Sequence, residues 1–128
     1  MQPKTVELHK QSKQLELGYA DDARYHLTAE YLRVLSPSAE VRGHSADEAV
    51  LQHGKKHVGI NMIAAVGNYA LQIFFDDQHD TGIYSWDYLY DLCINQDDHW
   101  QRYLLQLESN GKSRDPDEQV LQLFDPNK

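Results

Sequence analysis

Histidines and carboxylates are the side chains of this sequence best suited to chemistry. The 128 residues include seven histidines and one cysteine, and neutral imidazoles together with carboxylates bind zinc or iron. His44, His53 and His57 lie close together along the chain, but the glycine after His53 and the strand expected from His57 disfavour a helical pair of ligands. We therefore predict that these histidines are solvated loop residues.

His79 and Asp80 allow two interpretations. In the first, the imidazole is a metal ligand that a carboxylate orients. In the second, Asp80 and Thr81 form a turn in which their side chains bind nearby backbone groups. We favour the turn. The alternative is a zinc or iron site that combines His79 with His44, Asp77 or Asp80.

Motifs of common enzyme classes are absent from the sequence. It contains no G-x-S-x-G nucleophile elbow and neither glycine-rich phosphate-binding pattern, G-x-x-x-x-G-K-[ST] or G-x-G-x-x-G. Cys93 falls on the apolar stripe of a predicted helix, so we expect it in the core. The carboxylate pairs Asp76-Asp77 and Asp97-Asp98 occupy turn or cap positions and are interpreted as solvated charge. We therefore predict no catalytic residue.

The composition is that of one globular, acidic domain spanning 1–128. The net charge is −8 and the lysines and arginines are scattered, which disfavours nucleic acid and anionic membranes as partners. No apolar run approaches the roughly 18 residues of a membrane-spanning helix. A single cysteine permits no internal disulfide, so we expect a cytoplasmic protein.

The first half of the chain predicts three strands and two short helices. Alternation of apolar and polar residues marks the strands, at 5–9, 14–19 and 24–27. Thr28 is a suitable N-cap for the first helix. Ser36 followed by Pro37 predicts the start of the second helix, and Gly43 predicts its end. Residues 44–54 are predicted to form a surface loop.

A hairpin over 57–76 is the clearest structural prediction. Two apolar faces flank Gly67-Asn68, which suits a two-residue turn because both residues tolerate positive φ. Such a turn brings apolar residues of the two strands opposite one another: Val66 with Tyr69, Ala64 with Leu71, Met62 with Ile73, and Ile60 with Phe75. A slip of one residue would send one set of side chains to the wrong face.

The second half predicts a further strand and then helices. Residues 83–84 extend the sheet, and Ser85 caps a helix whose apolar stripe is Trp86, Leu89, Tyr90 and Cys93. Another helix begins at Asp97 or Asp98 and ends at Gly111. A last segment, 115–124, carries Val120, Leu123 and Phe124 and is expected to dock on the body. The predicted fold class is α+β: a small, mostly antiparallel sheet packed by C-terminal helices.

Three motifs in this order resemble one known family. They are YLRVLSPSAEVRGH at 31–44, VGNYA at 66–70 and HDTGIYSW at 79–86. Together they are similar to the gamma-butyrobetaine hydroxylase-like N-terminal domain, a family long catalogued as of unknown function. The resemblance extends over about 15–92, which leaves 96–128 as a C-terminal helical extension.

The resemblance implies a degenerate zinc site. In the carnitine-synthesis oxygenases of the family, this domain precedes a 2-oxoglutarate and iron dependent catalytic domain. It holds zinc through C-x-C-x-x-C and one distant histidine. The matching positions here are Ser36, Ser38, Val41 and His79. A serine hydroxyl stays protonated and valine offers no lone pair, so no zinc is expected there, and the two serines are expected to be helix caps. No His-x-Asp marks an oxygenase iron site, so hydroxylase activity is not expected.

The leading functional hypothesis is a non-enzymatic accessory or interaction module without a cofactor. The domain is similar to a module attached to P-loop scaffold proteins of iron–sulfur cluster assembly, which implies a protein partner from that machinery. The alternatives are the zinc or iron protein described above and a regulatory domain related to 2-oxoglutarate-dependent hydroxylases. Oligomeric state stays open.

The expected working surface joins the 33–44 segment to the 77–82 turn. Its candidate residues are Arg33, Ser36, Ser38, Arg42, His44, His79 and Asp80. Arginine suits carboxylate or phosphate recognition because its guanidinium is a planar fork of donors. For Arg33 and Arg42, an ion pair with a nearby acidic residue is the structural alternative.

Overall fold

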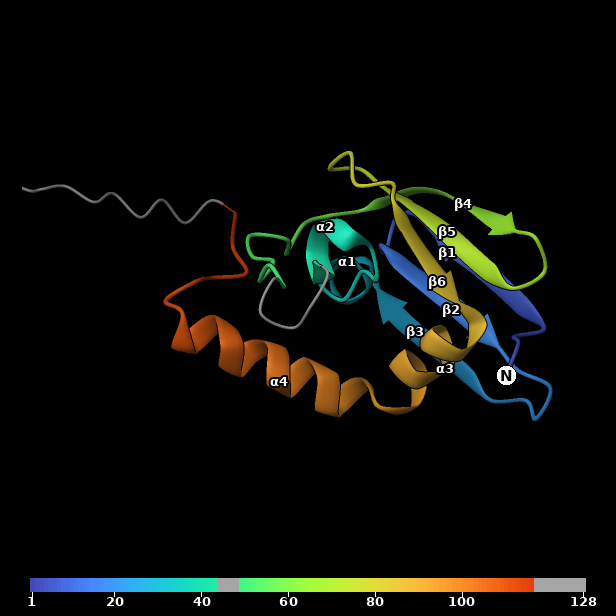
Figure 1. Cartoon of the computed structure of the whole chain (residues 1–128). Helices are drawn as coiled ribbons and strands as arrows, with labels where there is room; N and C mark the ends of the chain where they lie inside the picture. The colour runs from blue at the N-terminus through green and yellow to red at the C-terminus, as the bar shows by residue number, and fades with distance from the viewer. Residues whose placement is uncertain (44–48, 117–128) are drawn as a thin grey trace, which may run out of the picture.

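The computed structural model describes residues 1–43 and 49–116, in which strands and helices form an α+β arrangement (Figure 1). The first sheet is antiparallel, with the strand order β1-β2-β3. Its strands are β1 (Thr5–His9), β2 (Gln14–Gly18) and β3 (Arg24–Thr28). Leu15, Leu17 and Leu27 are completely buried, so the alternating pattern correctly predicted these strands.

The second sheet contains the predicted hairpin. Its strands are β4 (Ile60–Val66), β5 (Ala70–Phe75) and β6 (Gly82–Ser85), in the antiparallel order β4-β5-β6. The antiparallel strands and the α+β class are confirmed, but the six strands divide into two sheets. In Figure 1 the first sheet lies behind the second.

The predicted register of the hairpin was wrong by one residue. Val66 pairs with Ala70 instead of Tyr69, because the connection contains three residues, Gly67, Asn68 and Tyr69. Gly67 supplies a positive φ of 53°. The Tyr69 side chain then points outward and is 61% exposed.

A bulge in β4 explains why the apolar face of β5 is nevertheless buried. The register shifts between Ile60 and Met62, so Ile60 pairs with Phe75 as predicted, whereas Ile63 rather than Met62 lies opposite Ile73. The extra residue turns Met62 to solvent and Ile63 toward the core.

The first two helices follow β3. Helix α1 (Ala29–Val34) begins at Thr28, whose side chain accepts a hydrogen bond from Tyr31 N at 3.1 Å, as predicted. Helix α2 (Ala39–Arg42) ends at Gly43, also as predicted. Its start is not at Ser36-Pro37: Ser38 occupies the N-cap position, and its side chain makes no capping hydrogen bond.

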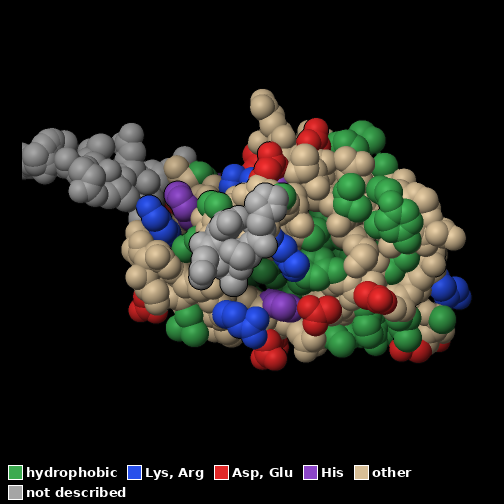
Figure 2. All heavy atoms as spheres, in the orientation of Figure 1, with side chains coloured by type: hydrophobic (Ala, Val, Ile, Leu, Met, Phe, Trp, Pro, Cys, Tyr) green, Lys and Arg blue, Asp and Glu red, His purple; other side chains and the backbone are tan. Residues whose placement is uncertain are grey.

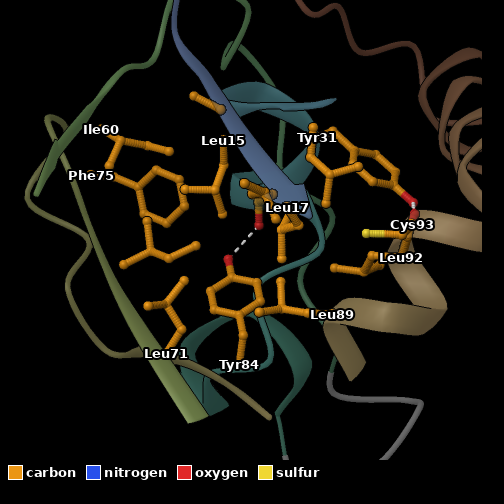
Figure 3. Packing of buried hydrophobic residues seen from close by; sticks show 14 of the residues in the cluster. Leu15, Leu17, Tyr31, Ile60, Leu71, Phe75, Tyr84, Leu89, Leu92 and Cys93 are labelled. Carbon is orange, nitrogen blue, oxygen red and sulfur yellow. Dashed lines mark hydrogen bonds between the residues drawn. The ribbon is translucent and has the colours of Figure 1, made fainter. Parts of the chain in front are cut away.

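The last two helices follow β6 and pack against different parts of the molecule, the first against strands of both sheets and the second against α1. Helix α3 (Trp86–Ile94) is capped by Ser85, and α4 (Gln96–Ser109) is followed by Gly111 with a φ of 63°. Side chains from both sheets meet those of α1 and α3 in one core (Figure 3). Two buried tyrosines bind the backbone there: Tyr84 donates to Leu32 O, and Tyr31 donates to Leu92 O at 2.7 Å.

The segment after α4 returns to α1. The Arg114 guanidinium makes two hydrogen bonds of 2.8 Å to the buried Glu30 carboxylate. The predicted helical segment at 115–124 lies mostly outside the described residues. Within the described part of the chain, no helix is long and apolar enough to cross a membrane.

Candidate functional site

His79 lies at the centre of the candidate site. It belongs to the turn between β5 and β6, and only 6% of the residue is exposed. Its Nε2 atom is 2.8 Å from Ser36 Oγ and 3.3 Å from Ser38 Oγ, both in the segment that links α1 to α2. His79 is therefore not a solvated loop histidine, in contrast to His53 and His57, which are exposed as predicted.

Glu40 connects the other side of the imidazole to the turn. Its Oε1 atom lies 3.3 Å from His79 Nδ1 and accepts a 2.7 Å hydrogen bond from the hydroxyl of Thr81. The Thr81 side chain thus contacts α2 rather than the nearby backbone that the sequence suggested. Sequence reasoning did not single out Glu40, because no local pattern shows that α2 packs against a turn forty residues later.

Ser36, His79 and Glu40 have the order of contacts found in a nucleophile, a base and an orienting acid. Accessibility argues against that chemistry, since Ser36 is 0% exposed. Ser36 Oγ also accepts from Ser38 N at 3.4 Å, and a Cβ atom at Gly82 would lie only 2.9 Å from it. In this structure the hydroxyl therefore contacts protein groups and is not exposed to solvent.

An ion-pair cluster lies beside the imidazole. Asp77 Oδ2 accepts hydrogen bonds from Arg33 Nε at 2.9 Å and Lys55 Nζ at 2.7 Å, and Arg33 also donates to Gln52 Oε1 at 3.0 Å. Asp77 Oδ1 accepts from the backbone N of His79 at 3.3 Å. Asp77 is therefore not the solvated charge that the sequence suggested. Arg33 forms an ion pair with it, which was the structural alternative to a role in recognition.

Burial and charge shift two pKa values in this cluster. Burial alone would raise the pKa of Asp77, but the hydrogen bond from Lys55 and the charge of Arg33 outweigh it and lower that pKa. Burial lowers the pKa of His79, and the Arg33 charge adds to this effect against the opposing Glu40 and Asp77 carboxylates. At neutral pH the cluster thus holds an ionised Asp77 and an uncharged imidazole.

The remaining candidate residues lie at the edge of this cluster. The Arg42 guanidinium stacks over the Tyr88 ring with Cζ 4.6 Å from its centroid, and Tyr88 donates to Leu35 O at 2.6 Å. Asp80 is exposed, and its backbone carbonyl accepts from Gln72 Nε2 at 2.7 Å. His44 lies outside the described residues.

Two cavities adjoin the site. The smaller measures about 280 Å³ and is polar, lined by Arg33, Glu40, Val41, Gln52, Asp77, Gln78 and His79. The larger measures about 420 Å³ and lies between the α1–α2 segment, α3 and α4, with Leu35, Val41, Arg42, Tyr88 and Tyr103 among its walls. Val41 borders both cavities.

The four positions that the family resemblance matched to zinc ligands therefore gather in one place, but their atoms do not fit the ion. Ser36 and Ser38 present hydroxyls to the same imidazole nitrogen, and Val41 presents methyl groups. Structural zinc needs thiolates or further imidazoles. Of the two serines predicted to be helix caps, Ser38 occupies the N-cap position of α2, whereas Ser36 does not. Neither side chain makes a capping hydrogen bond to α2, and both contact His79 instead.

These features define a small α+β domain built around a buried histidine–serine cluster. The chain belongs to the family described as gamma-butyrobetaine hydroxylase-like, N-terminal, whose model matches residues 6–90. The match begins earlier than the sequence motifs suggested and includes all of β1 except its first residue.

Solved structures support this assignment. One NMR solution structure of a protein is 52% identical, covers 96% of this chain and 97% of that chain, and has a TM-score of 0.81. A second is 44% identical, with coverages of 97% and 92% and a TM-score of 0.76. A crystal structure of a protein of unknown function from Acidithiobacillus ferrooxidans ATCC 23270, of the DUF971 family, is 36% identical, with coverages of 71% and 91% and a TM-score of 0.59. A search of curated proteins gives no match.

Proposed function

We propose that this chain is a non-enzymatic interaction module that binds a protein partner through α2 and the turn between β5 and β6. The observation that carries the proposal is the complete burial of Ser36 beside His79. This hydroxyl has a base at hydrogen-bond distance, but no part of the residue is exposed, which disfavours a role as a nucleophile. Cys93 is also buried, and burial raises the pKa of its thiol to about 11, which disfavours a thiolate nucleophile.

The hydrogen bonds of the cluster give this surface a rigid base. Glu40 holds α2 to the turn through His79 and Thr81, and Asp77 holds the turn to Arg33 and Lys55. A surface fixed in this way loses little conformational entropy when a partner binds.

The exposed charges at the surface have both signs. Arg42 lies at the end of α2, and Glu40 and Asp80 provide carboxylates near the turn. Mixed charges favour a protein partner with a complementary pattern. They do not favour a nucleic acid, because Arg33 and Lys55 are both engaged by the Asp77 carboxylate. On the face shown in Figure 2, lysines and arginines are scattered rather than gathered into a basic patch.

A partner from iron–sulfur or metal-cofactor assembly is the class that we propose. Its support is the sequence similarity to a module attached to P-loop scaffold proteins of cluster assembly. The proposed role is that of an accessory protein. In this role the histidine–serine cluster supports the binding surface and does not take part in chemistry.

Charge reversal combined with cross-linking tests the proposal. The tagged chain is cross-linked in cells, and captured proteins are quantified for the wild type, Arg42→Glu and Asp80→Lys. Arg102→Glu is the matched control, because it reverses an exposed arginine on α4. We expect a captured iron–sulfur assembly protein to fall about tenfold with the two site variants, equivalent to about 1.4 kcal/mol, and to persist with the control. Equal loss with the control, or no specific partner, contradicts the proposal.

A further inference from the structure

The outward face of the first sheet gathers a second group of histidines and carboxylates. Among the described residues, one group of three or more potential ligands has all its ligand atoms within 4.8 Å of one another, and it consists of Glu7, His9 and Glu16. It is formed by strands that do not contribute to the histidine–serine cluster.

Strand register explains why these residues meet. Glu7 and His9 are two positions apart on β1 and therefore share a face. Glu7 pairs directly with Glu16 on β2, and Glu16 pairs in turn with His26 on β3. The neighbours of Glu16, Leu15 and Leu17, are buried in the core, so the four polar side chains occupy the opposite face.

The distances among the ligand atoms suit a small divalent ion. His9 Nε2 lies 2.9 Å from Glu16 Oε1 and 3.7 Å from Glu7 Oε1, and His26 Nε2 lies 3.4 Å from the same Glu16 oxygen. Two ligands of tetrahedral zinc, each about 2.0–2.2 Å from the ion, are about 3.3–3.6 Å apart. Small rotations of exposed side chains are enough to reach this spacing.

The central carboxylate is held in place by an arginine. Arg24 Nη1 donates to Glu16 Oε2 at 2.7 Å, which leaves Oε1 facing the two imidazoles. Carboxylates that bind a metal through one oxygen are commonly oriented by a hydrogen-bond donor on the other oxygen, as Arg24 is placed here.

We propose that Glu7, His9 and Glu16 form a surface site for a divalent transition-metal ion, zinc above all, with His26 beside the fourth coordination position. Two imidazoles and two carboxylates are ligands that zinc accepts. Glu7 and Glu16 carry two negative charges against the one positive charge of Arg24, so the face attracts a dication. This proposal is independent of the partner-binding function.

Calorimetric titration of the untagged, chelator-treated chain with zinc chloride tests the site. We expect one equivalent to bind in the micromolar range, with an affinity at least about tenfold lower in His9→Gln and in Glu7→Gln, or about 1.4 kcal/mol. Both side chains are exposed, so neither change is expected to affect folding.

His99→Gln is the matched control. His99 Nε2 lies 2.9 Å from Asp91 Oδ2, the same distance as between His9 and Glu16, and this pair is not part of a group of three ligands within the described residues. The zinc affinity of the His99→Gln variant should equal that of the wild type. Equal weakening in the control, or unchanged affinity in the His9 and Glu7 variants, overturns the proposal.

Amide shift mapping locates the ion independently of affinity. The proposal requires zinc to perturb resonances of β1, β2 and β3, with His26→Gln reducing the change on β3. Zinc-dependent shifts centred on His79 would assign the binding to the other cluster and overturn the proposal. Weak shifts of amides near many carboxylates would show an adventitious ion only and would also overturn the proposal.

Discussion

The Nε2 atom of His79 lies 2.8 Å from the hydroxyl oxygen of Ser36, although 43 positions separate the two residues. This contact joins the segment between α1 and α2 to the turn between β5 and β6. The same place holds Ser38 and Val41, so the three positions that the family resemblance matched to zinc-binding cysteines lie together beside this imidazole.

Introducing thiols at these three positions should therefore create a zinc site. We expect the variant Ser36→Cys/Ser38→Cys/Val41→Cys to bind one cobalt or zinc ion with His79 as the fourth ligand, because three thiolates and an imidazole form a complete tetrahedral set. Cobalt absorption with thiolate charge-transfer bands measures this directly and separates it from any site without cysteine. Adding His79→Gln is the control and should alter the spectrum. A triple variant without thiolate bands would show that the backbone does not position the ligands.

Removing the guanidinium of Arg33 should destabilise the domain strongly. Arg33→Met leaves Asp77 partly buried with Lys55 as its remaining cation, and we expect a loss of about 2–3 kcal/mol in the free energy of unfolding by urea. Arg24→Met removes an arginine from the more exposed pair with Glu16 and should cost about 1 kcal/mol or less. Similar losses in the two variants would contradict a structural role for Arg33.

The same pair predicts a dependence on pH. The pKa of Asp77 is lowered in the folded state, so its stabilising effect is present above the ordinary aspartate pKa of about 3.9 and is lost as the pH falls toward the folded value. The difference in unfolding free energy between wild type and Arg33→Met should therefore shrink below about pH 4. A difference that stays constant from pH 7 to pH 3 would exclude this linkage.

His79 should make the protein less stable in mild acid. Its pKa is lowered by burial, so below the ordinary value of about 6.5 the unfolded chain binds a proton that the folded chain rejects. Unfolding free energy should decline as the pH falls from about 7 toward the folded pKa, and His79→Gln should remove part of this slope. An NMR titration of the His79 ring protons gives the folded pKa itself. A value at or above 6.5 would contradict the expected burial effect.

Cys93 should be inert toward thiol reagents in the folded protein. It is buried on α3, and burial raises its pKa to about 11, so both access and thiolate formation are suppressed. We expect Ellman's reagent to react only as fast as the domain opens, and at full rate in urea. Rapid reaction without denaturant would show that α3 is not packed as described.

Local patterns predicted most of the architecture. Alternating Leu15 and Leu17 indicated β2, and the hydroxyls of Thr28 and Ser85 marked the starts of α1 and α3. The hairpin register failed because Gly67-Asn68 fits a two-residue and a three-residue connection equally well. The compensating bulge near Met62 leaves no sign in the sequence, since it is set by packing against the core.

The site was harder to predict than the fold. Ser36, Ser38 and His79 were identified through family motifs, but their hydrogen bonds depend on how α2 meets a distant turn. Glu40 and Lys55 were missed, and Asp77 was misjudged as solvated, for the same reason: each acts through a partner far away in the sequence. The group around Glu16 needs the register of three strands before it becomes visible.

The paired hydrogen bonds between Arg114 and Glu30 limit how far the C-terminus can be trimmed. Truncation just before position 114 would leave the buried carboxylate of Glu30, in the first turn of α1, without this arginine. Shortened versions for crystallisation or isotope labelling should accordingly keep this arginine.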